Sequence, residues 1–187
     1  MILSPEDIRR VRPVAENLND PSRLVTYMRE AEALRLIDAI GAGVYRWFDE
    51  SDFWGDGPFV YARPDGVKIS ITRQEYDTIM DGGYYTTDCG MFKTEGLRAA
   101  IAYIAYSRFV VNNPITPTAY GVVYKDGQFS TRVEDSVMVR SSNEAKKIGE
   151  AYLDGVVAHL KALGLLCSCS RSAGASSRDI IVKSRKL

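Results

Sequence analysis

TEGLRAAIAYIAYSRFVVNN, residues 94–113, is apolar on nearly every face of a helix of about five turns. Only Arg98 and Arg108 interrupt it, and its many small side chains would let neighbouring helices approach closely. The two asparagines before Pro114 predict an abrupt end, because a residue that precedes proline disfavours helical backbone. A membrane span would need an apolar run of about 18 residues or more, which the arginines prevent. We therefore predict a buried central helix.

Composition limits the classes of protein to which the chain could belong. Its 187 residues suffice for one domain with a real core, and 24 basic residues balance 24 acidic ones. Nothing global therefore favours nucleic acid or an anionic membrane as a partner. No export signal is visible, and an odd count of three cysteines fits reduced thiols. A zinc site would need nearly all of Cys89, Cys167, Cys169 and the single histidine, His159, to converge, so neither metal nor other cofactor is expected.

The patterning predicts one domain over residues 1–187, mainly α with β-hairpins (α+β). A helical core is expected over residues 4–51, 72–113 and 135–163, hairpins over 59–71 and 118–133, and a β-forming, basic tail over 165–187. Capping signals support the helix starts: Ser4 precedes Pro5, and Thr72 with Glu75 forms a capping box. Residues 84–92 are interpreted as a connector that leads into the central helix.

The second hairpin is predicted to project as an arm. Residues 120–124 and 129–133 read as its strands, with a Lys-Asp-Gly-Gln turn between them. Two strands cannot hold themselves in water, so the arm must lie on its own core or on a neighbour. Burial against the protein's own helices and use as an interface are equally weighted, since tyrosine is a favoured interface anchor. The candidate interface residues are Tyr120, Val122, Tyr124, Lys125, Phe129 and Arg132.

The sequence lacks the motifs of the common hydrolases, phosphate-binding loops and zinc proteases. His159 falls between helical core positions, where a partly buried histidine with a hydrogen-bonded ring nitrogen is more frequent than a Cys-His pair. Cys167 and Cys169 would share one face of a strand, where filling space is a commoner role than binding soft metal. The acidic run at 49–52 lacks the spacing of a calcium loop. We therefore expect no enzyme and no catalytic residues.

The basic carboxyl terminus is the remaining feature that could bind a ligand. Lys183, Arg185 and Lys186 have no acidic neighbour after Asp179 and could contact DNA phosphate or a partner, although a solvated terminus is the more frequent explanation. A nucleic-acid-binding module that uses this terminus and surface tyrosines is therefore the first alternative function. A small enzyme with an unrecognised site is the second.

A series of motifs in this order resembles a known family. They are SPEDIRRVRPVxxNL (4–18), RLxxYMxEAE (23–32), IGxxVY (40–45), MDGGxY (80–85), GLRxAIAYxAYxRFVxNN (96–113), TxYGVVYK (118–125) and EAxxIxEAYL (144–153). Together they are similar to the small head-to-tail connector proteins of tailed phages, the adaptor or head-completion proteins. The likeness is strongest to those of phages and prophages of Bacteroides-type bacteria, and it covers roughly residues 4–163.

The resemblance implies a mostly helical subunit of a homo-oligomeric ring, dodecameric in this family. The ring would dock under the portal protein, continue the DNA channel and contact the next tail or stopper component. Residues 115–133 would be the assembly arm. DNA would pass through the lumen without sequence-specific binding, which zero net charge favours. The implied location is the head-to-tail junction of the virion, with assembly in the host cytoplasm and no membrane partner. Whether the ring is an adaptor or a stopper stays open.

Overall fold

A computed structural model describes residues 2–11, 21–50, 58–112, 115–118, 121–124 and 135–166 of the chain. Helices dominate it, and each of the three described sheets is a two-stranded antiparallel hairpin, which confirms the predicted mainly α fold with β-hairpins. The helices are α1 (Pro5–Val11), α2 (Pro21–Ala31), the π-helical η1 (Glu32–Leu36), α3 (Ile37–Ile40), α4 (Ala42–Glu50), α5 (Arg73–Asp81), α6 (Leu97–Asn112) and α7 (Asp135–Ala162).

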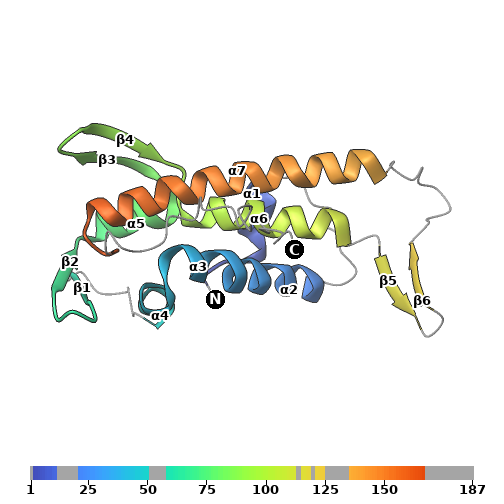
Figure 1. Cartoon of the computed structure of the whole chain (residues 1–187), viewed down its shortest axis with the longest axis horizontal. Helices are drawn as coiled ribbons and strands as arrows, with labels where there is room; N and C mark the ends of the chain where they lie inside the picture. The colour runs from blue at the N-terminus through green and yellow to red at the C-terminus, as the bar shows by residue number, and fades with distance from the viewer. Residues whose placement is uncertain are drawn as a thin grey trace, which may run out of the picture.

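Helix α6 lies at the centre of the helical body, as the sequence predicts. It runs between α7 on one side and α2 on the other, and α1 also packs on it (Figure 1). Leu97, Ile101 and Ile104 are buried together with its small residues. A glycine of α7, Gly149, faces the backbone of α6 so closely that a Cβ there would stand 2.8 Å from the carbonyl oxygen of Ala100. Within the described ranges, no helix is long and apolar enough to cross a membrane.

The amino-terminal segment is tied to the body by one buried carboxylate. Glu32, in the first turn of η1, is 3% exposed. Its Oε1 accepts hydrogen bonds of 3.0 Å from the backbone N–H groups of both Ile2 and Leu3, and its Oε2 accepts one of 2.9 Å from the Tyr45 hydroxyl. Burial, reinforced by this carboxylate, raises the pKa of Tyr45 well above its usual value. The contacts join the chain start, η1 and α4.

The first predicted hairpin and the helix after it are confirmed. Strand β1 (Phe59–Ala62) pairs with β2 (Lys68–Ile71) in a register that places Phe59 opposite Ile71. Phe59, Tyr61 and Ile71 turn towards the core and are buried. Helix α5 then begins with the capping box that Thr72 and Glu75 predict.

Residues 84–92, interpreted from the sequence as a connector, belong instead to a hairpin. Strand β3 (Gly83–Thr87) pairs with β4 (Gly90–Thr94) between α5 and α6. The two ends of this hairpin meet where Gly82 (φ +92°) and Gly96 (φ +87°) bring their backbones together; a Cβ on Gly96 would lie 2.4 Å from the nitrogen of Gly82. The sequence of these two strands did not predict a hairpin, because apolar and polar residues do not alternate along it.

The described part of the projecting arm is a hairpin whose first strand the sequence did not predict. The strand at β6 (Gly121–Tyr124) is confirmed, and it pairs with β5 (Ile115–Thr118); the predicted pairing with residues 129–133 falls outside the described ranges and stays a prediction. Only two residues separate β5 from β6, so closing this loop costs less chain entropy than the longer one predicted. The hairpin lies beyond the ends of α6 and α7 (Figure 1). The predicted tail is described only through Leu165 and Leu166, both buried; its remainder lies outside.

Candidate functional site

The sequence-predicted interface residues are not settled by the structure. Val122 and Tyr124 lie in β6, but the description stops at their backbone, and Tyr120, Lys125, Phe129 and Arg132 lie outside the described residues. The same holds for Lys183, Arg185 and Lys186 and for Cys167 and Cys169. Cys89 is an exposed free thiol in the turn between β3 and β4. The residue assignments on the arm and the basic tail therefore remain predictions.

A groove of about 540 Å³ runs between η1, α6 and α7. Leu34, Ile104 and Val111 contribute apolar surface to it, and Leu34 is 57% exposed. Three basic side chains also line it, and each has an acidic neighbour: Arg35 and Lys146 pair with Glu150, and Arg108 pairs with Glu30 at 3.0 Å. Asn112, the last residue of α6, belongs to the lining. The groove therefore adjoins the point where the chain leaves α6 for the arm.

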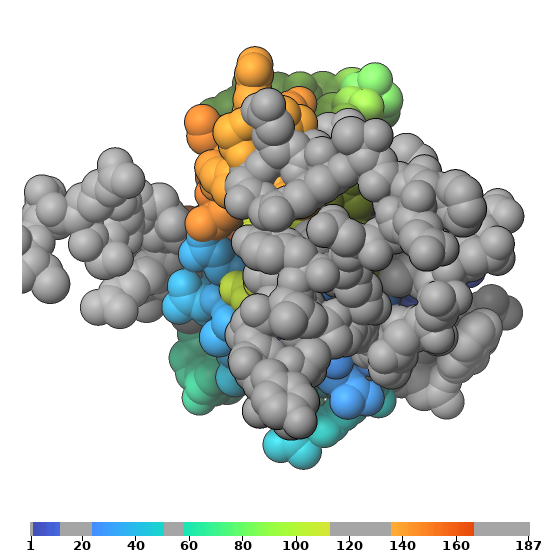
Figure 2. All heavy atoms as spheres, turned by 90° about the vertical axis from the view of Figure 1, so that its right-hand side faces the viewer, coloured from blue at the N-terminus to red at the C-terminus, as the bar shows by residue number. Residues whose placement is uncertain are grey.

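Apolar side chains are also exposed at the two ends of the helical body. At the end away from the arm, the β3–β4 hairpin presents Tyr84 (68% exposed), Met91 (71%) and Phe92. At the other end, Val137 and Val139 are exposed in the first turns of α7. Figure 2 views this second end, where α7 forms the upper part of the described surface and α2 to α4 lie below it. Clustered exposed apolar residues mark contact surfaces more often than scattered ones do. This favours the hairpin, because Val137 and Val139, two positions apart in a helix, face different sides of α7.

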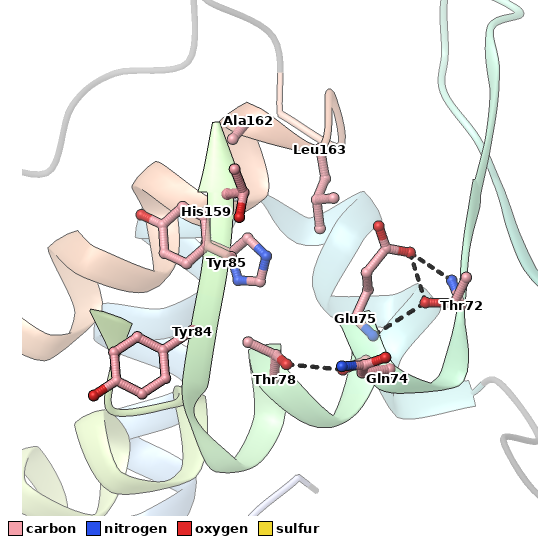
Figure 3. Close-up of a pocket in the computed structure, with 10 residues that line it drawn as sticks. Thr72, Gln74, Glu75, Thr78, Tyr84, Tyr85, His159, Ala162 and Leu163 are labelled. Atoms are coloured by element: carbon pink, nitrogen blue, oxygen red, sulfur yellow. Dashed lines mark hydrogen bonds between the residues drawn. The ribbon is translucent and has the colours of Figure 1, made fainter. Parts of the chain in front are cut away.

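A separate pocket of about 340 Å³ lies where α5, β3 and the last turns of α7 meet (Figure 3). Mostly polar side chains line it, with an apolar wall from the end of α7. The lining consists of Thr72, Gln74, Glu75, Thr78, Tyr84, Tyr85, Thr86, His159, Ala162 and Leu163. Glu75 is the one charged side chain among them if the histidine is neutral.

His159 forms one wall of the pocket and is only 2% exposed. Its ring stacks on Tyr85 with the centroids 4.0 Å apart and the planes 15° from parallel. The sequence predicted a partly buried histidine with a hydrogen-bonded ring nitrogen; the ring is instead almost fully buried, and its Nδ1 has no hydrogen-bond partner in the described part of the chain. Burial lowers the pKa of His159 from its ordinary 6.5, and the Glu75 carboxylate partly opposes that shift. The imidazole is therefore neutral at physiological pH.

Glu75 is held at the pocket edge by the cap of α5. Its Oε2 accepts hydrogen bonds from the backbone N–H of Thr72 at 2.7 Å and from the Thr72 hydroxyl at 2.9 Å. Nearby, the Thr78 hydroxyl donates to the carbonyl oxygen of Gln74 at 2.8 Å, which leaves its oxygen lone pairs as acceptors. The pocket thus offers several acceptors and one negative charge. No sequence motif signalled it, because the end of α7, far along the chain from the neighbouring elements α5 and β3, completes it.

The part of the chain that the structure describes contains no cluster of three or more histidine, cysteine, aspartate or glutamate residues able to hold a metal ion.

Residues 60–164 match a family of unknown function, DUF6712, and the match runs from β1 to just past α7. It spans more than half of the 187 residues and leaves α1 to α4 outside. No curated protein and no solved structure matches the chain.

Proposed function

We propose that this chain, which belongs to the DUF6712 family, is a non-enzymatic structural subunit of a phage head-to-tail connector ring. The ring docks under the portal protein and lets DNA pass through its lumen. The observation that carries the proposal is the position of β5–β6, which lies beyond the ends of α6 and α7 rather than on the helical body. The motif resemblance of residues 4–163 to phage connectors supplies the identity of the assembly.

A ring built from one kind of subunit needs two different, complementary surfaces on each copy. The arm, residues 115–133, supplies one. The groove between η1, α6 and α7 supplies the other, because it is open, partly apolar and next to the root of the arm. The arm begins just after Asn112, at the level of the groove on its own subunit. In a ring, the neighbouring subunit presents the same groove at the same height, where the arm can reach it.

The chemistry of the groove suits an aromatic arm. Leu34 offers an exposed apolar surface, and tyrosine rings cover such a surface while their hydroxyls stay near polar atoms. Arg35 and Arg108 are already paired with Glu150 and Glu30, so they form a polar rim rather than a strong anion site. The arm's sequence holds Tyr120, Tyr124 and Phe129 for this contact.

The β3–β4 hairpin gives the subunit a further contact surface at its opposite end. Tyr84 and Met91 lie on one face of the hairpin, since the register pairs Tyr84 with Lys93 and Thr86 with Met91. A connector ring touches the portal on one side and the next tail component on the other. We assign this hairpin to one of those two contacts, separate from the contact between copies in the ring.

The test examines complexes with the portal protein and, for the unchanged chain, purified particles, because connector subunits are often monomers before docking. One variant replaces residues 120–133 with a short glycine-serine linker. A second, Leu34→Asp, places a charge in the groove; its matched control, Val60→Asp, changes an apolar residue of similar exposure (52% against 57%) on the β1–β2 hairpin. Each is expressed with the portal protein of the same viral genome, and complexes are sized and imaged by electron microscopy.

The expected result is a ring on the portal with the unchanged chain and with Val60→Asp, and none with the linker variant or Leu34→Asp, although circular dichroism shows all four folded. Normal rings from the linker variant would remove the arm from the proposal, and absence of the protein from purified particles would end it. A gel shift with duplex DNA at near-physiological salt tests the nucleic-acid-binding alternative; a salt-dependent shift without any assembly would favour that function instead.

A further inference from the structure

We propose that the pocket between α5, β3 and α7 binds an organic cation the size of a side chain, a primary ammonium or guanidinium group on an alkyl stem, with Glu75 as its counter-ion. This inference is independent of ring assembly. It concerns a site at the end of the helical body that is remote from the arm (Figure 1).

The charge of the pocket selects a cation. Glu75 carries the one charge of the lining, because His159 is neutral and neither lysine nor arginine lines the cavity. A phosphate or carboxylate would meet no positive partner there and would face the Glu75 carboxylate. The capping bonds from Thr72 occupy Oε2, so the carboxylate is fixed in place while Oε1 can accept from an N–H donor in the pocket.

The unpaired histidine nitrogen is the second, independent observation. Buried polar atoms are almost always hydrogen-bonded, and one without a partner is costly. In Figure 3 the His159 ring and Glu75 lie on opposite sides of the space, with Thr78 below and Leu163 above. With the proton of the neutral imidazole on Nε2, Nδ1 is an acceptor, and an ammonium or guanidinium group between the two side chains has enough N–H donors for the carboxylate, the Thr78 oxygen and Nδ1. Nδ1 has no surface open to solvent, so this last contact requires a small shift of the side chains over it.

The apolar parts of the wall fit the stem of such a ligand. Leu163 and Ala162 stand at the end of α7 on one side of the cavity. The ring of Tyr84 is largely exposed and points away from Glu75, so it does not face this space (Figure 3). Alkyl stems pack against apolar surface while the charged head seeks polar partners. A free amine and the lysine or arginine side chain of another protein share this chemistry.

Nuclear magnetic resonance of the full chain labelled with 15N-histidine tests the proposal, because His159 is the single histidine and gives one set of imidazole signals. The probes are butylammonium and butylguanidinium, with the neutral isostere butylurea and inorganic phosphate as controls. Capped arginine and lysine amides distinguish the sources. Binding of the capped amides points to a protein side chain as the natural ligand, whereas binding of the free alkyl cations alone points to a small amine.

Glu75→Gln is the decisive variant, since glutamine at this position keeps the capping box and removes the charge. It should weaken cation binding by about tenfold or more. Asp77→Asn removes a charge from the same helix at a residue that pairs with Arg73 outside the pocket, and it should bind as the unchanged chain does. Circular dichroism checks that both fold. Absence of a saturable His159 shift with every cation, an equal response to butylurea, or unchanged binding by Glu75→Gln would overturn the proposal.

Discussion

The close contact between α6 and α7 at Gly149 yields a sharp stability prediction. Gly149 of α7 lies against α6, and a Cβ added there would stand 2.7 Å from Cγ1 of Ile104, 2.8 Å from the carbonyl oxygen of Ala100 and 3.1 Å from the nitrogen of Ile104. Two of these three atoms are backbone, so a change of rotamer cannot relieve the clash. Gly149→Ala must therefore push α6 and α7 apart along the most extensive helix contact of the fold.

The expected magnitude is a balance of two effects. Overpacking a tight core contact costs about 1–3 kcal/mol, and the upper end applies where backbone must move. Replacing glycine with alanine inside a helix returns up to about 1 kcal/mol. Gly149→Ala should therefore lower the free energy of unfolding by about 2 kcal/mol. Gly155, on the same helix, is the matched control: the nearest atom to its added Cβ is the Thr94 hydroxyl oxygen at 4.0 Å, so Gly155→Ala should raise stability by up to about 1 kcal/mol.

Urea unfolding followed by far-ultraviolet circular dichroism measures both variants. The two free energies of unfolding should differ by about 3 kcal/mol, and for a chain of this length each kcal/mol shifts the melting temperature by about 2–4 °C. Equal or greater stability of Gly149→Ala relative to the unchanged chain would refute the close packing of α6 on α7. Strong destabilisation by Gly155→Ala would refute the reasoning that separates the two glycines.

Three further predictions concern other parts of the fold. Gly96→Ala should cost at least about 3 kcal/mol of stability, because Gly96 has a left-handed backbone and its added Cβ would stand 2.4 Å from the Gly82 backbone. Gly66 is also left-handed (φ +85°) but faces open space, so Gly66→Ala should cost only about 1–2 kcal/mol. Equal losses of stability in thermal unfolding would contradict the close approach of Gly96 to Gly82. Glu32→Ala removes the acceptor of the backbone N–H groups of Ile2 and Leu3. Residues 2–3 should therefore exchange their amide hydrogens faster, and the free energy of unfolding should fall by about 2–4 kcal/mol. Unchanged exchange would argue against Glu32 as the group that holds the amino-terminal segment. Because the pKa of His159 is lowered in the folded state, the unfolded chain takes up the proton first as the pH falls. The contribution of the neutral histidine to stability is therefore complete above about pH 6.5 and is lost as the pH falls through the folded-state pKa. His159→Phe should remove this pH dependence from the free energy of unfolding measured in urea, and an identical pH slope in both proteins would refute the assignment.

The pocket illustrates what pattern reading misses in this chain. His159 stood out in the sequence as the single histidine, and helical periodicity placed it near the core. Its neighbours were unpredictable, since Tyr85 belongs to a hairpin that no alternation of apolar and polar residues signalled. Glu75 was predicted as a helix cap, a role that the structure confirms. Glu75 also lies on the edge of a cavity, opposite His159, and this depends on how α5 packs near the end of α7.

Local chemistry along the chain was enough to predict several elements. The apolar faces of residues 94–113 required a buried helix, Thr72 with Glu75 required a helix start, and the turn signal between Tyr61 and Val67 required a hairpin. These features depend on residues within a few positions of one another, where periodicity, capping and turn preferences act directly.

Only the folded chain decided the features that join distant segments. Glu32 holds the backbone of a residue 30 positions away, Gly149 admits α7 against the backbone of α6, and β6 pairs with the strand before it, a partner that the sequence did not predict. In each case, alternative partners compete for the same carboxylate, helix face or strand edge. Such competition is settled by which arrangement satisfies buried polar atoms and fills space at the least cost in chain entropy, and no local pattern contains that information.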